Sequence, residues 1–276
     1  MRTINEVRQD FLALHVPGTP LLIPNPWDLG SAKLLATLGF RALATTSSGF
    51  AATLGRADGE VSREEAIAHA AALADAVEVP VSADLEHGFG AAPDAVFATV
   101  SAAAATGLAG CSIEDFSGNP EAPIYPIELA AERIAAAVQA AHEPDVPLVL
   151  TARAENLIHG IHDLDDTILR LQAFQEAGAD VLYAPGLTRL EDVRSVISAV
   201  DLPVNVLARP GLGSVAELAA ASVARISVGG GFAFASFAAL TRAGAELLEH
   251  GNFGYLNDAA QGHAQLVAAI NPPAKE

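Results

Sequence analysis

Short apolar runs rich in β-branched residues recur along this chain, and each is followed by a loop and then by a longer segment rich in Ala, Leu and Glu. The short runs have the length of buried strands, and the longer segments carry apolar residues at helical spacing. Strands are predicted at residues 20–24, 42–46, 79–84, 110–114, 147–152, 180–184, 203–207 and 224–228. Helices are predicted between them, near residues 30–38, 63–76, 93–106, 126–142, 164–177, 190–199 and 215–221.

The alternation of strand and helix predicts an α/β fold with a parallel sheet. Eight such strands close most simply into a (β/α)₈ barrel of the TIM type, and 276 residues suit one domain of this kind. An open, doubly wound sheet is the alternative. It usually has a glycine-rich turn after its first strand, where this chain has Asn25-Pro26-Trp27-Asp28. We therefore expect a single barrel domain over residues 1–276.

The helical pattern continues beyond the eighth strand. Residues 232–251 predict one or two helices, and residues 255–269 predict another. This is more helix than barrel closure requires, so residues 232–276 form a C-terminal extension. Such surplus helices either cap the barrel or pack on a neighbouring subunit.

The composition of the chain restricts the partners and the cellular compartment that we expect for the protein. Hydrophobic residues make up 51% of the chain, but none of its runs reaches the 18 strongly apolar residues of a membrane span. The formal net charge of −18 repels nucleic acid and anionic membranes, so we expect neither as a partner. The amino-terminal residues lack the pattern of a secretion signal, and the single cysteine, Cys111, suits a reducing compartment. We therefore expect a soluble cytoplasmic protein.

Acidic residues follow two neighbouring strands at the end where barrels of this type carry their active sites. Asp84 and Glu86 end the third predicted strand and, being two residues apart, point to the same side. Glu114 ends the fourth strand and can reach the same point. Three carboxylates without a histidine or thiolate favour a hard cation, Mg²⁺ before Mn²⁺. The alternative is that these acids cap helices or pair with Arg153.

Other strand ends offer groups for an anionic substrate. Arg153, after the fifth strand, could hold a carboxylate through a bidentate fork or form a purely structural ion pair. The segment Ser47-Ser48-Gly49 offers hydroxyl and backbone N–H groups to a carboxylate or phosphonate, or it simply begins a helix. His87 is a candidate base or ligand, or a hydrogen-bonded bystander. Asn205 lies on the seventh strand.

These motifs together resemble the isocitrate lyase/phosphoenolpyruvate mutase superfamily. The likeness covers roughly residues 20–232, and its most specific part is Asp84-Leu85-Glu86-His87-Gly88-Phe89-Gly90 followed by Ile113-Glu114-Asp115. The other matching segments are Asn25-Pro26-Trp27-Asp28, Thr46-Ser47-Ser48-Gly49, Asp58, Thr151-Ala152-Arg153 and Ala177-Gly178-Ala179-Asp180.

The resemblance implies a barrel whose C-terminal helix is exchanged between subunits, as a homodimer or tetramer. It implies Mg²⁺ held by Asp84, Glu86 and Glu114, partly through water. Members make or break C–C bonds, or in some cases C–P bonds, beside a 2-oxo acid through an enolate. We assign catalytic roles to Arg153, Asp58 and His87, and substrate contacts to Ser47, Ser48, Gly49, Trp27, Arg153 and Asn205.

The loop after the fourth strand departs from this superfamily. Lyase members carry a Lys-x-Cys-Gly-His type loop there, whereas residues 116–126 contain neither cysteine nor lysine. The gate of mutase members is also incomplete, since only Asn119 could replace its asparagine. Magnesium-assisted decarboxylation or cleavage of a small 2-oxo dicarboxylate such as oxaloacetate needs the least from this loop. A C–P bond enzyme (phosphonopyruvate hydrolase or phosphoenolpyruvate mutase type) and a non-catalytic 2-oxo-acid binder are the alternatives. His87, Tyr183 and a metal-bound water are the candidate proton donors.

Overall fold

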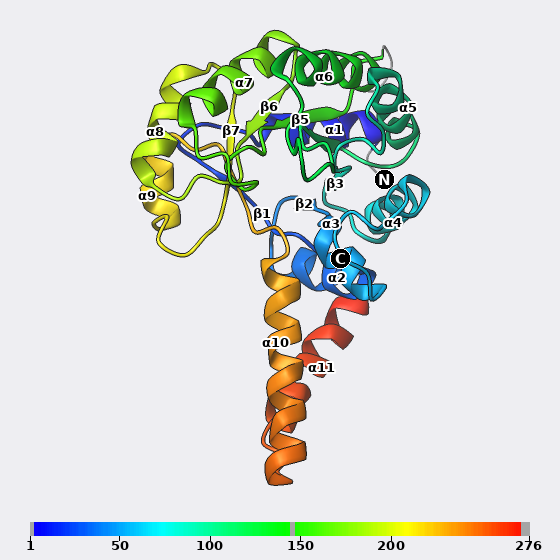
Figure 1. Ribbon diagram of the computed structural model, residues 1–276. Helices are drawn as coiled ribbons and strands as arrows, with labels where there is room; N and C mark the ends of the chain where they lie inside the picture. The colour runs from blue at the N-terminus through cyan, green and yellow to red at the C-terminus, as the bar shows by residue number, and fades with distance from the viewer. Residues whose placement is uncertain (1–2, 144–146, 272–276) are drawn as a thin grey trace.

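The computed structural model describes residues 3–143 and 147–271 of the chain (Figure 1). Its strands form one parallel sheet in the order β1-β8-β7-β6-β5-β4-β3-β2. The strands are β1 (Leu21–Ile23), β2 (Leu43–Ala44), β3 (Val81–Asp84), β4 (Gly110–Glu114), β5 (Val149–Arg153), β6 (Val181–Tyr183), β7 (Val204–Leu207) and β8 (Arg225–Ser227). The backbone N–H of Ala44 donates to the carbonyl of Pro24 over 3.1 Å and links β2 to the β1 end of the sheet. The predicted (β/α)₈ barrel is confirmed, and the open sheet is excluded.

The helices between the strands lie where the periodicity places them, with ends shifted by at most a few residues. They are α2 (Leu29–Thr37), α4 (Arg63–Ala76), α5 (Pro93–Ala104), α6 (Ile127–Ala141), α7 (Leu164–Glu176), α8 (Leu190–Ala199) and α9 (Val215–Ala220). Several begin at a polar residue whose side chain accepts a hydrogen bond from the first turn, which satisfies a free backbone N–H. These capping residues include Asp28, Ser62, Asp163 and Ser214.

Two helices were not predicted from the pattern, α1 (Ile4–Ala13) and α3 (Ser47–Thr53). The first opens with a capping box between Thr3 and Glu6, a signal that is legible in the sequence as Thr-x-x-Glu. The second is only seven residues long, too short for a helical period to stand out.

Helix α1 closes the amino-terminal end of the barrel. Its Phe11 is fully buried in a cluster with residues from the starts of several strands, namely Leu21, Ala42, Ala109, Val149 and Val181. A Cβ on Gly110 would lie 2.8 Å from Phe11 Cε1 and 2.6 Å from the carbonyl oxygen of Val149, so glycine is required for this close approach. The interior of the barrel therefore opens toward the carboxyl ends of the strands.

Two buried polar residues, His15 and Arg225, contact each other next to the Phe11 cluster that closes the barrel. The Arg225 guanidinium donates to His15 Nε2 over 3.1 Å, and His15 Nδ1 donates to the carbonyl of Phe11 over 2.9 Å. Burial, followed by the repulsion of the Arg225 cation, lowers the pKa of His15 to about 3. His15 is therefore neutral in the folded protein at all moderate pH values.

We expect the free energy of unfolding to carry a pH dependence that His15 controls. The folded pKa of about 3 lies below the ordinary value of 6.5, so the stability due to neutral His15 is complete above pH 6.5 and is lost as the pH falls toward 3. Between pH 8 and pH 5 the loss should be about 2 kcal/mol. Urea unfolding at both pH values measures it. His15→Gln, which keeps a donor and an acceptor, should lack this component.

The exposed His263 on the C-terminal helix provides the matched control. His263→Gln should show the same change in unfolding free energy between the two pH values as the wild type. If His15→Gln also matches the wild type, the neutral buried imidazole is not what we describe.

The chain after β8 forms an arm that projects from the barrel (Figure 1). Helix α10 (Gly231–Ala245) leads into the π-helical turn η1 (Glu246–His250), and α11 (Leu256–Ile270) runs back and packs against α2. Large apolar side chains are exposed along this arm, among them Leu240 at 68%, Leu248 at 88% and Phe253 at 61%. In residues 3–143 and 147–271, no helix combines the length and apolar character needed to cross a lipid bilayer.

Candidate active site

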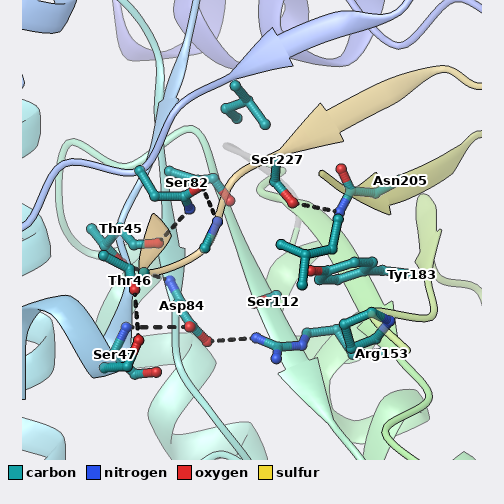
Figure 2. A pocket seen from close by; sticks show the side chains of 18 of the residues that line it. Thr45, Thr46, Ser47, Ser82, Asp84, Ser112, Arg153, Tyr183, Asn205 and Ser227 are labelled. Atoms are coloured by element: carbon teal, nitrogen blue, oxygen red, sulfur yellow. Dashed lines mark hydrogen bonds and ion pairs between the residues drawn. The ribbon is translucent and has the colours of Figure 1, made fainter. Parts of the chain in front are cut away.

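A cavity of about 150 Å³ opens at the carboxyl ends of the strands. In Figure 2, a direct ion pair joins Asp84 to Arg153 in the wall of this cavity. Thr46 and Ser47 lie on one side, and Tyr183 lies on the other. The predicted site residues that line this cavity are Ser47, Ser48, Asp58, Asp84, Arg153 and Asn205. Glu86 lines a much smaller adjoining pocket beside Asp84 and Ser47.

Arg153 is surrounded by three carboxylates rather than free to face a ligand. Its Nη1 lies 2.9 Å from Asp84 Oδ1, its Nη2 lies 3.0 Å from Glu114 Oε2, and its Nε lies 2.9 Å from Glu155 Oε1. Burial disfavours the cation, but these carboxylates outweigh burial and raise the pKa of Arg153. Of the three predicted metal ligands, Asp84 and Glu114 therefore form ion pairs with this arginine, as the sequence left open, and the third partner is Glu155. Three carboxylates around one guanidinium leave an excess of negative charge.

The ionised forms of the other two predicted metal ligands, Glu86 and Glu114, are disfavoured by their surroundings. Burial, with the nearby carboxylates of Asp84 and Asp58, raises the pKa of Glu86 to about 8. Burial also raises the pKa of Glu114 well above its usual range. At the cavity rim, desolvation and the Asp84 carboxylate raise the pKa of Asp58. Within the described parts of the chain, however, no three Asp, Glu, His or Cys side chains gather closely enough to enclose a metal ion.

The loop that carries Glu86 is held in an unusual backbone conformation. Glu86 has φ +49° and Phe89 has φ +58°, left-handed values that cost a side-chain-bearing residue about 1–2 kcal/mol each. Arg133 of α6 holds this loop by donating to the carbonyls of Gly90 and Ala91, both over 2.6 Å, and to that of His87. The position of the loop that carries Glu86 therefore depends on Arg133, a buried residue more than 40 positions later in the sequence.

His87 and Trp27 lie outside the cavity lining. The His87 ring is tilted against Phe89 with their centroids 6.1 Å apart, and burial lowers its pKa. A Cβ on Gly49 would lie 3.2 Å from Trp27 Cβ and 2.6 Å from Thr46 Cγ2, so Trp27 packs behind the start of α3. The chemical roles predicted for these two side chains stay predictions.

The segment Ser47-Ser48-Gly49 fits both of its predicted interpretations. Thr46 caps α3 by accepting from the N–H of Gly49 over 3.3 Å, so the segment begins a helix. Ser47 and Ser48 nevertheless line the cavity, and the N–H of Ser47 donates to Asp84 Oδ2 over 3.3 Å. The first turn of α3 therefore brings Ser47 and Ser48 to the cavity, whereas the N–H groups of Ser47 and Gly49 already donate to Asp84 and Thr46.

Three residues that matter at this site were not assigned to it from the sequence. Glu155 could have been found, because it follows Arg153 by two positions and shares its side of an extended segment. Arg225 reaches the cavity from the middle of the barrel. Tyr183, considered only as a proton donor, lies with its ring centroid 5.3 Å from the Arg153 guanidinium carbon, and burial raises its pKa to about 12. No local sequence signal marks these last two residues.

The loop after Glu114 stands away from the cavity. Phe116 and Ile124 form an antiparallel bridge, and Ser117 Oγ donates to the carbonyl of Ala122 over 2.6 Å. The Phe116 ring stacks on that of His159 with centroids 3.9 Å apart. No described residue of the segment 116–126 lines the cavity, including Asn119, the position that could replace the mutase asparagine.

The chain is similar in sequence and in fold to several known proteins. A family model for phosphoenolpyruvate phosphomutase matches residues 11–248. The chain is 31% identical over 211 residues to 2-methylisocitrate lyase from Escherichia coli, with 70% of each chain covered. It is 27% identical over 245 residues to oxaloacetate decarboxylase from a Marinomonas species, with 86% of this chain and 82% of that one covered. The solved structure of a candidate lyase/mutase from Burkholderia cenocepacia is 47% identical, with a TM-score of 0.93, and the match covers 98% of this chain and 97% of that one.

Proposed function

We propose, from the premise that the chain belongs to the phosphoenolpyruvate phosphomutase family and so to the isocitrate lyase/phosphoenolpyruvate mutase superfamily, that it is a magnesium-dependent carbon–carbon lyase. Its substrate would be a small 2-oxo dicarboxylate, with decarboxylation of oxaloacetate as the simplest case. The observation that carries the proposal is the cluster of three carboxylates around Arg153, beside a cavity whose described lining contains neither cysteine nor lysine.

The side chains present argue against cysteine-based chemistry. Cys111 is the only cysteine of the chain, and it is fully buried in β4. Burial raises its pKa to about 12, so it remains a thiol at neutral pH. Decarboxylation requires charge stabilisation and a proton rather than a nucleophile, and this requirement suits the residues that line the cavity.

The carboxylates fit a hard divalent cation held mainly through water. Asp84 and Asp58 both line the cavity, and Glu86 lies in the adjoining pocket beside Asp84. Burial, joined by neighbouring carboxylates, raises the pKa of Asp58, Glu86 and Glu114, and a cation bound beside them would offset the cost of ionising these groups. We assign Asp84 as a direct ligand of Mg²⁺, or of Mn²⁺, and Glu86, Glu114 and Asp58 as ligands through water. Bound there, the ion would polarise the substrate carbonyl and stabilise negative charge on the enolate oxygen.

Side chains of the protein would orient the substrate and donate a proton to the enolate. The hydroxyl groups of Ser47 and Ser48 would hold the carboxylate next to the carbonyl. Arg153 would keep positive charge beside the developing enolate. Tyr183 remains protonated at neutral pH, because its pKa is raised to about 12, so its hydroxyl can donate to the enolate.

The experiment is a substrate test on protein stripped of metal with EDTA. With Mg²⁺ restored, we expect loss of oxaloacetate and formation of pyruvate at least about 100-fold above the stripped protein. Asp84→Asn at the same Mg²⁺ concentration controls for decarboxylation by free metal. 2-Methylisocitrate and phosphonopyruvate are tested in parallel.

The other functions predict different outcomes of the same test. Magnesium-dependent release of phosphate from phosphonopyruvate would identify a C–P bond enzyme. Thermal stabilisation by oxalate without turnover of any of the three substrates would identify a non-catalytic binder. Either result would refute the carbon–carbon lyase.

A further inference from the structure

The inside of the barrel below Asp84 and Arg153 is lined by small polar side chains. Ser82 and Ser112 each stand two residues before an acidic residue of the site, so they share its side of the strand and lie one level deeper. Ser227 lines the same cavity from β8. Barrels of this type usually fill this level with bulky branched residues. Here three serines line the cavity, together with the apolar side chains of Ile23 and Leu207, and leave it open.

Arg225 is part of the wall of this deeper space. It lies two residues before Ser227 on β8, and only 5% of it is exposed. Its Nε donates to Asn205 Oδ1 over 3.1 Å, and its Nη2 donates to Thr151 Oγ1 over 2.9 Å. Its Nη1 donates to His15 Nε2 over 3.1 Å. All three acceptors are neutral, so the arginine is firmly positioned but not neutralised.

The two arginines of the cavity differ in their charge environment. Arg153 touches three carboxylates, whereas Arg225 forms no ion pair with any acid in the described parts of the chain. Burying an uncompensated charge is costly, and burial lowers the pKa of Arg225 to about 10, which still leaves it protonated at neutral pH. Its three hydrogen bonds use three of the five guanidinium N–H groups, so two remain for a ligand.

The charge of the whole protein makes this cation more significant. The chain carries a formal net charge of −18, and the mouth of the cavity holds Asp58 and Asp84. A substrate with two carboxylates must therefore find positive charge inside the site. Arg225 is the arginine of the cavity lining that no carboxylate already occupies.

We propose that the deep end of the cavity is a subsite for the distal carboxylate of the substrate, with Arg225 as its counter-charge and the hydroxyls of Ser82 and Ser112 beside it. The proposal rests on the proposed function, because it assumes that the 2-oxo end of the substrate lies at the level of Asp84 and Arg153. The subsite would restrict the substrates to small acids in which a short carbon chain separates two anionic groups. Asn205 is then a positioning residue, since it orients the Arg225 guanidinium.

The test compares ligands with and without the distal group. Calorimetric titration of the magnesium-loaded protein with malate, which has a distal carboxylate, is set against titration with oxalate, which has none. Arg225→Met should weaken malate binding by about 100-fold and oxalate binding by at most about threefold. Arg225→Lys should recover part of the loss for malate. Kinetically, Arg225→Met should act on oxaloacetate mainly by raising KM.

Control variants and further ligands test whether the effect is specific to Arg225. Arg189→Met removes an exposed arginine and should change neither affinity. Unfolding curves of both Arg225 variants show whether the barrel is intact, and Arg225→Lys serves if the methionine variant does not fold. Equal weakening of malate and oxalate, no weakening of either, or failure of the wild type to bind malate would overturn the subsite. Tighter binding of phosphonopyruvate than of malate, lost in Arg225→Met, would overturn its assignment to a carboxylate.

The subsite and the proposed function can fail separately. If the wild type turns over oxaloacetate and Arg225→Met does so equally well, the subsite is wrong while the lyase stands. If the wild type binds malate through Arg225 but cleaves none of the substrates, the lyase is wrong while the subsite stands.

Discussion

Replacing Arg153 with methionine is expected to lower kcat/KM for oxaloacetate by about 10³-fold and to destabilise the fold at the same time. The guanidinium contacts Asp84, Glu114 and Glu155 within 3.0 Å, so its removal leaves three carboxylates facing one another without a cation. Breaking such a buried arrangement by removing one partner costs about 3–5 kcal/mol. Steady-state kinetics and urea unfolding measure the two losses.

The loss of stability should depend on pH in a defined direction. Burial already holds the pKa of Glu114 above its usual range, and the Arg153 cation limits that rise. Without Arg153 the folded-state pKa of Glu114 rises further, so at this site the folded variant binds more protons than the unfolded chain. Its free energy of unfolding should therefore fall as the pH rises. The deficit relative to the wild type should be larger at pH 8 than at pH 5.5. Protonation at low pH removes the repulsion that the arginine otherwise balances.

Two further variants separate charge from geometry. Arg153→Lys keeps a positive charge but cannot direct an N–H to each carboxylate, so its activity and stability should lie between those of the wild type and the methionine variant. Arg56→Met breaks an exposed ion pair with Glu65 and should change neither activity nor stability measurably, because solvent screens such pairs. A methionine variant with wild-type kcat/KM, or with a stability deficit independent of pH, would refute this role for Arg153.

Charging the C-terminal arm should convert an oligomer into a monomer. We propose that the exposed apolar faces of α10 and α11 pack against a second copy of the chain, because contiguous apolar surface of this kind marks an interface in most proteins. Leu240 and Leu248 are 68% and 88% exposed, and burying each leucine contributes about 1.5–3 kcal/mol per subunit. The double variant Leu240→Glu, Leu248→Glu should elute as a single chain of 28.3 kDa, as measured by light scattering.

The barrel itself offers the control for this experiment. Leu169 of α7 is also exposed, at 56%, but it lies on the barrel rather than on the arm. Leu169→Glu should therefore keep the mass of the wild type. A monomeric wild type, or a double variant that keeps the wild-type mass, would show that the arm is not an interface between copies.

The sequence alone determined the architecture and the position of the site. Strand and helix periods act over a few residues, so they can be read locally, and they placed the barrel elements nearly where they lie. Caps such as Ser62 and Asp163 act over the same short range. The carboxyl ends of parallel strands meet at one end of a barrel, so the convergence of Asp84, Arg153 and Asn205 on the cavity followed from topology.

The tertiary structure decided what those residues do to one another. Asp84 and Arg153 are 69 positions apart, and only the closed barrel brings a single guanidinium between three carboxylates. The same closure sets Arg225 beside His15, 210 positions away, under a cavity that small side chains keep open. Hydrogen bonds and ion pairs act over about 3 Å, a range at which sequence separation carries no information. The acidic cluster and its pairing with Arg153 could therefore be named from the sequence as alternatives, whereas the three partners of Arg153 and the place of Arg225 could not.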